Sequence, residues 1–196
     1  MLDTPANPNG GRAVTLEQRA AANHTAAATH HIYARQFHLV AARHYQIGTD
    51  YAHAAYQALI AHGHTLRAMD HLQQAIDDYA EHGVLPEQEI FIVRRGDPWK
   101  RYMERFLLAS NAVTVATNLS GAEHHAAAAG HADRAARHHG HASIHCDGRE
   151  FPLAARESQI ANDHALHSVY HGNAAARHYV EHFDPAIAAG GFALRI

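Results

Sequence analysis

The chain has 196 residues but only one cysteine, Cys146, so it can form neither an intramolecular disulfide nor a zinc site built from cysteines alone. It has no basic excess, because 16 lysines and arginines are balanced by 19 acidic residues, and we expect no nucleic-acid binding at neutral pH. No apolar run approaches the roughly 20 residues of a membrane span. The N-terminal sequence MLDTPANPNGGR lacks a basic start followed by an apolar run, so we expect no signal peptide and a cytoplasmic location.

Signatures of several enzyme classes are missing from the sequence. There is no phosphate-binding loop, serine-nucleophile elbow or dinucleotide fingerprint. Di-iron four-helix bundles carry a Glu-x-x-His motif on two of their helices, and this sequence contains none. We therefore expect a protein that is not an enzyme, and keep an enzyme with an unrecognised site as a third hypothesis.

What the chain does have is 22 histidines and an internal duplication. The stretch AAYQALIAHGHTLRAMDHLQQAIDDYAEH, residues 54–82, recurs 100 residues later, and an upstream block recurs 94 residues later. The second copy therefore has six extra residues, which we place in a loop within residues 140–151. The retained side chains are mostly histidines, with the pairs His30/His124, His31/His125, His44/His138, His64/His164, His71/His171 and His82/His182. Self-similarity of this kind predicts a duplicated fold unit.

The pattern of helix signals predicts a mainly α protein, in which two helical hairpins form a four-helix bundle with one shared core. We expect a flexible lead-in at residues 1–14, a first hairpin at 15–83, a connector at 84–97, a second hairpin at 98–183 and a tail at 184–196. The helices are expected at about 15–47, 50–82, 98–139 and 152–183. Thr15 with Gln18 forms a capping-box pattern, and Gly48 is a typical residue just after a helix. Residues 89–95 either form a two-stranded ribbon with 191–196 or an extended connector.

Large apolar residues at helical spacing predict the core face of each helix in the first hairpin. The predicted core residues are Ala28, Ile32, Leu39, Val40 and Ile47 in the first helix, and Ala55, Leu59, Leu66, Met69 and Ile76 in the second.

The fourth predicted helix has the strongest candidate chemistry. Its histidines share one face, and two pairs of them are four residues apart: His164, His167, His171, His178 and His182. Neutral imidazoles on one helical turn can chelate Zn²⁺, Ni²⁺, Co²⁺ or Cu²⁺. The alternative is a solvated histidine face. We expect this helix to bind metal before any other part of the chain.

A related row on the second helix is poorer in close pairs and consists of His53, His64, His71 and His82. His24, His31 and His38, spaced by seven residues, could face this row across the hairpin and complete interhelical sites. A weaker candidate is a mixed site of His141, His145 and Cys146 in the inserted loop.

The texture of HAAYQALIAHGHTLRAMDHLQQAIDDYAEH resembles small bacterial alanine- and histidine-rich helical-hairpin proteins of uncharacterised function. The resemblance covers residues 30–82 best and 124–182 less well. It implies a helical hairpin and no activity or catalytic residue.

The sequence therefore favours a cytoplasmic, homo-oligomeric protein that binds or buffers divalent transition metals through histidine rows, with zinc, nickel, cobalt or copper as the ion. The second hypothesis is a pH-responsive structural or interaction bundle that self-assembles. Protonation of all 22 histidines would change the net charge from −3 to +19, which is the basis of this alternative.

Overall fold

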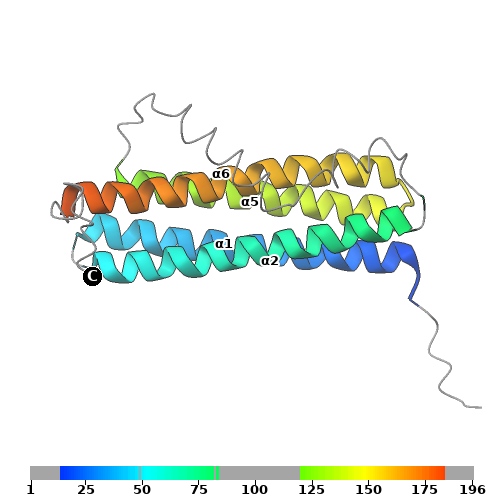
Figure 1. Ribbon diagram of the computed structural model, residues 1–196, viewed down its shortest axis with the longest axis horizontal. Helices are drawn as coiled ribbons and strands as arrows, with labels where there is room; N and C mark the ends of the chain where they lie inside the picture. Colours follow the sequence, from blue (N-terminus) through cyan, green and yellow to red (C-terminus); the bar gives the residue numbers. More distant parts are fainter. Residues whose placement is uncertain (1–13, 49, 82, 84–119, 184–196) are drawn as a thin grey trace, which may run out of the picture.

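The computed structural model describes residues 14–48, 50–81, 83 and 120–183, and these form a bundle of four long helices (Figure 1). The helices are α1 (Leu16–Ile47), α2 (Tyr51–Glu81), α5 (Gly121–Asp147) and α6 (Phe151–Phe183). No strand occurs within these ranges. The predicted mainly α four-helix bundle is therefore confirmed, whereas the predicted ribbon, connector, lead-in and tail lie outside the described residues.

Several helix ends are determined by capping hydrogen bonds and backbone conformations that the local sequence predicts. The hydroxyl of Thr15 accepts a hydrogen bond from the Gln18 amide, and the Gln18 side chain bonds back to Thr15. Gly48 ends α1 in the left-handed conformation, with φ of 73°. The Asp50 carboxylate then accepts from the His53 amide at the start of α2.

The third predicted helix, 98–139, does not run unbroken through residue 120 and does not end at 139, whereas its predicted start near residue 98 lies outside the described residues. Ser120 is extended and caps α5 through a capping box with Glu123, so no helix continues through it. At the other end, α5 continues through Gly140 to Asp147, because a single glycine costs a helix only about 1 kcal/mol. The six extra residues of the second copy therefore lengthen a helix by about 9 Å instead of forming a loop.

The predicted core face is also largely wrong. Ile32, Leu39 and Val40 are 39–45% exposed, Ile47 is 59% exposed and Leu59 is 68% exposed. Ile76 is the one large predicted core residue that is buried, at 5%.

The real core is a set of alanine rows with a seven-residue spacing. Fully buried alanines recur in each helix: 20, 27, 34 and 41 in α1, 54, 61, 68 and 75 in α2, 128, 135 and 142 in α5, and 154, 161 and 175 in α6. Between them, three or four residues away, α1 buries His24, His31 and His38. This 3–4 alternation is the spacing of coiled-coil cores, and small alanine side chains allow the helices to approach closely.

The bundle is built around α1 and α5, which run antiparallel and each pack against one further helix. His24 lies beside His139 and His38 beside His125, so residue numbers rise along one helix as they fall along the other. α2 packs on α1 and α6 packs on α5, whereas α2 and α6 touch each other only sparingly. The side of the bundle between α2 and α6 is therefore the least tightly closed.

Candidate metal site

Each hairpin carries histidines along the junction between its two helices. We call the junction of α1 and α2 the first seam and that of α5 and α6 the second seam. The seven-residue spacing that places alanines in the core also aligns a neighbouring row of partly exposed side chains on the same side of each helix. The second seam is lined by His124, His131, His138 and His141 from α5, and by Glu157, His164, His167 and His171 from α6.

In the second seam the two rows interleave. The Nδ1 atoms of His124 and His171 are 3.1 Å apart, and those of His131 and His164 are 3.2 Å apart. The His131 ring also stacks on His167 and His171, at centroid distances of 4.9 and 5.6 Å. Two nitrogens bound to one tetrahedral Zn²⁺ at about 2.05 Å would be about 3.3 Å apart. The same separations also suit a hydrogen bond between two neutral imidazoles, one donating and one accepting.

A three-residue group lies at one end of the second seam. Among the described residues, His138, His141 and Glu157 form the one set of three or more potential metal ligands whose donor atoms all lie within 4.8 Å of one another. His138 Nδ1 donates to Glu157 Oε2 at 2.6 Å, and His141 Nδ1 is 3.5 Å from the same oxygen. Two histidines and one glutamate form a donor set that Zn²⁺ accepts in proteins.

Partial burial keeps several of these side chains in the protonation state that a metal requires. Desolvation, together with Arg134 and the neighbouring histidines, lowers the pKa of His131 to about 3. Desolvation and the nearby His124 and His167 lower the pKa of His171 to about 4. Burial raises the pKa of Glu157, but the hydrogen bond and the charge of His138 outweigh this effect and the net pKa is lowered. His131 and His171 are thus neutral imidazoles and Glu157 is an ionised carboxylate at neutral pH, the forms that coordinate metals.

The first seam is a reduced version of the second. His30 stacks on His71 as His124 approaches His171 at the equivalent positions, and the Nδ1 atoms of His30 and His64 are 3.0 Å apart. Where the second seam has His131, however, the first has Phe37, whose ring stacks on His64 at 5.5 Å. Where the second seam has Glu157, the first has Gln57.

Near that end of the first seam, His53 is exposed. Its Nε2 lies 2.8 Å from Gln57 Nε2, and its ring lies 4.4 Å from that of His44. The amide of Gln57 is uncharged and binds metals more weakly than a carboxylate.

The row His24, His31 and His38 does not pair with the histidine row of α2, as one of our expectations had it, but lies at the interface of α1 and α5, where His24 also bonds to Tyr79 of α2. All three are at most 2% exposed. They pack with His125 and His139, for which the sequence analysis proposed no core role, although both lie three residues before a buried alanine. Desolvation lowers the pKa of His24 to about 4 and those of His31 and His38 to about 3, so these imidazoles are neutral core side chains.

The predicted mixed site of His141, His145 and Cys146 is not assembled, because α5 places Cys146 in the core and His141 at the surface. Cys146 is fully buried, with its Sγ 2.9 Å from the hydroxyl of Tyr79. Burial raises the pKa of the Cys146 thiol to about 11, which opposes the thiolate form that binds metals. His145 instead donates to Glu150 at 2.7 Å.

The remaining predicted ligands fall into two groups. His178 lies on α6 beyond His171, and its charge contributes to the lowered pKa of His124. His82 and the side chain of His182 are outside the described part of the chain.

No protein-family model, curated protein or solved structure matches the chain. Within its described ranges, none of the helices is both long enough and apolar enough to cross a membrane.

Proposed function

We propose that the chain binds divalent transition-metal ions, Zn²⁺, Ni²⁺, Co²⁺ or Cu²⁺, along the second seam. The observation that carries the proposal is the convergence of His138, His141 and Glu157 at the end of a continuous histidine row. His131, His164 and His171 extend the same donor chemistry along the seam.

The proposed role is binding or buffering without catalysis. Its support is the layout of the donors, which are spread along two helices over several turns instead of being gathered around one open coordination position. A buffer benefits from many exchangeable ligands, and borderline metal ions bind imidazole well. The seam is also partly exposed, so that an ion can reach it from solvent.

The test is a calorimetric titration of the full chain with Zn²⁺, Ni²⁺ and Cu²⁺. A triple variant, His138→Ala, His141→Ala and Glu157→Gln, is compared with a matched triple variant of the first seam. We expect the first variant to lose the tightest site and the matched variant, His44→Ala, His53→Ala and Gln57→Ala, to keep it. Equal metal stoichiometry and affinity in the parent and the second-seam variant would contradict the proposal.

A second candidate is a pH-responsive structural bundle, because buried histidines line the interface between the hairpins. Protonating His24, His31 or His38 would place a charge in the alanine core, which is unfavourable. The oligomer expected from the sequence belongs to this candidate as well. Exposed Ile32, Leu39 and Leu59 would supply apolar area to a second copy of the chain.

A further inference from the structure

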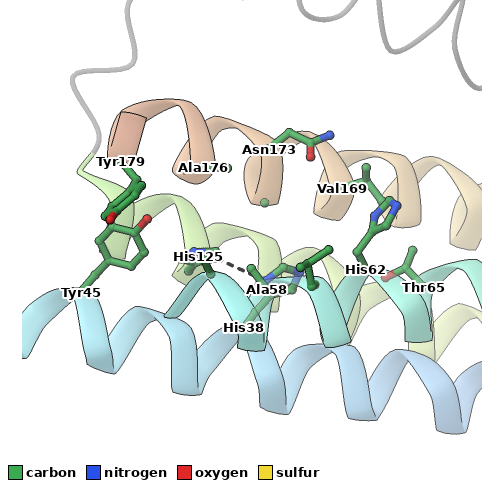
Figure 2. Close-up of a pocket in the computed structure, with 13 residues that line it drawn as sticks. His38, Tyr45, Ala58, His62, Thr65, His125, Val169, Asn173, Ala176 and Tyr179 are labelled. Atoms are coloured by element: carbon green, nitrogen blue, oxygen red, sulfur yellow. Dashed lines mark hydrogen bonds between the residues drawn. The ribbon is translucent and has the colours of Figure 1, made fainter. Parts of the chain in front are cut away.

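A cavity of about 320 Å³ lies where α2 and α6 face each other, on the least tightly closed side of the bundle (Figure 2). In Figure 2, His38 and His125 lie at its base, and Tyr45 and Tyr179 lie together at one end. Its walls come from α2 and α6 and include Ala58, Leu59, His62, Val169, Gly172 and Ala176.

The duplication explains why there is space at this place. Gly172 and Ala176 of α6 occupy the positions that Leu72 and Ile76 occupy in α2, 100 residues earlier. Leu72 and Ile76 are buried, at 7% and 5% exposure, so the equivalent positions in the other hairpin are filled by large side chains. At Gly172 a Cβ atom would come within 3.2 Å of His38 Cε1, so even alanine would crowd the base of the cavity. The second copy thus has less side-chain volume at these positions than the first.

The two tyrosines at the equivalent positions also differ. Tyr79 is fully buried and bonds through its hydroxyl to His24 Nε2 at 2.7 Å. Tyr179 is partly exposed and packs against the ring of Tyr51 at 5.7 Å. The same tyrosine is therefore part of the buried core in the first hairpin and lines the cavity in the second.

The base of the cavity supplies a fixed hydrogen-bonding pattern. The Nδ1 atoms of His38 and His125 are 3.3 Å apart, and the two rings are only 2% and 1% exposed. Such burial favours two neutral rings, of which one donates its Nδ1–H to the other Nδ1. The donating ring then has an acceptor Nε2 and the accepting ring has an Nε2–H donor, so the pair retains one acceptor and one donor.

The geometry points to a binding site for a small neutral aromatic molecule that carries a hydroxyl or amide group. The thirteen lining residues include no aspartate, glutamate, lysine or arginine to bind a charged ligand. The volume lies at the lower end of the range of about 300–1,000 Å³ for ligand pockets, which suits one or two fused rings. Offset or edge contacts with Tyr45 and the histidine rings would hold such a ring. None of the lining residues belongs to the proposed metal group, so this site stands independently of it.

The test uses 2-naphthol as a fluorescent probe of the full chain, with naphthalene as the probe that lacks the hydroxyl. Ala176→Ile fills the cavity from α6 with the side chain found at the equivalent position of α2. Ala58→Leu fills it from α2, and Ala126→Ile, at an exposed alanine of α5, is the matched control. Circular dichroism establishes that each variant remains helical.

We expect one saturable 2-naphthol site per chain, about tenfold or more weaker binding in both filling variants, and unchanged binding in Ala126→Ile. Naphthalene should bind the parent more weakly than 2-naphthol, since it cannot bond to the histidine pair. The proposal is overturned if the parent shows no saturable site, or if the folded filling variants bind as the parent does. Equal loss in Ala126→Ile would overturn it too, and equal affinity for naphthalene would overturn the assigned role of the histidine pair.

Discussion

The two hairpins share a helical framework and differ in the side chains along their seams. Both place a histidine of the inner helix against a histidine of the outer one, His30 on His71 and His124 near His171. Phe37 in the first hairpin corresponds to His131 in the second, and Gln57 corresponds to Glu157. With Arg67 in place of His167 and Ile47 in place of His141, these differences separate a mixed aromatic seam from one rich in metal ligands. The alanine rows determine how the helices pack, and a few positions beside them determine which donor groups the surface presents.

The largest effect is expected on acidification, which should lower the unfolding free energy. It should arise at the interface between the hairpins instead of at either seam. The pKa of His24 is lowered to about 4 and those of His31 and His38 to about 3, whereas an unfolded histidine titrates near 6.5. Between these pKa values the unfolded chain binds more protons than the folded chain. The unfolding free energy is therefore at its full value above about pH 6.5 and decreases as the pH falls below it. At pH 5 the loss is roughly 2 kcal/mol for each of these three histidines. Against a typical total of about 5–15 kcal/mol, we expect a large drop in unfolding free energy between pH 7.5 and 5.0, measured by denaturant titration.

Two adjacent histidines of α1 provide the control for this prediction. Neither ring nitrogen of the buried His31 has a hydrogen-bond partner among the described residues, so His31→Leu should preserve stability at pH 7.5 and reduce the acid loss by about 2 kcal/mol. His30 lies in the partly exposed first seam, and His30→Leu should reduce the loss less. If the two variants respond equally to pH, the acid sensitivity does not come from the interface.

The next largest effect is expected at the central alanines, which the two hairpins contribute symmetrically. Ala34 and Ala128 are equivalent positions of α1 and α5, and both are fully buried. Leucine at either position should force the helices apart and cost about 1–3 kcal/mol, as overpacking of a tight core does. We expect Ala34→Leu and Ala128→Leu to lower the unfolding free energy by similar amounts, with little change for Ala126→Leu at the surface. A marked difference between Ala34 and Ala128 would show that the hairpins are not equivalent in packing.

These alanines also show why the fold was easier to predict than the core. Thr15, Gly48 and Asp50 act through local hydrogen bonds and backbone conformation, which a short stretch of sequence contains. Ile32 and Leu39 were assigned to the core because large apolar side chains normally lie there. Here small side chains fill it, and polar histidines sit between them, so the hydrophobic pattern points to the wrong face.

Only about half of the candidate site could be predicted from the sequence, for a similar reason. The α6 histidines His164 and His171 were identified from their spacing, but their partners His131 and His138 come from α5, which was assigned no metal ligand in that stretch. Glu157 also carries no mark of its own in the sequence. Its part in the site depends on the pairing of two helices, which juxtaposes residues 19 positions apart.

A smaller effect, on affinity instead of stability, should follow from exchanging residues between the seams. His131 lies within ring contact of three α6 histidines, so His131→Phe, which copies the first seam, should weaken Zn²⁺ or Ni²⁺ binding by about tenfold. The reciprocal change Phe37→His should strengthen binding by the first seam. Calorimetric titration of both variants measures the two effects. If Phe37→His gains nothing while His131→Phe loses affinity, the difference between the hairpins lies in more than this one position.

The smallest expected effect is a gain at the end of the first seam. Gln57 lies 2.8 Å from His53, whose ring lies 4.4 Å from that of His44, so Gln57→Glu would place a carboxylate beside two imidazoles. This copies the two-histidine, one-glutamate group of the second hairpin, and a carboxylate is a much better metal ligand than an amide. We expect an additional, weak Zn²⁺ site in a variant whose second seam has been disabled by Glu157→Gln, with Gln57→Asn as the control that keeps an amide. If the additional site disappears when His53→Ala is introduced as well, the site belongs to this cluster. Equal stoichiometry in the glutamate and asparagine variants would mean that geometry, and not the missing carboxylate, keeps the first seam from binding metal.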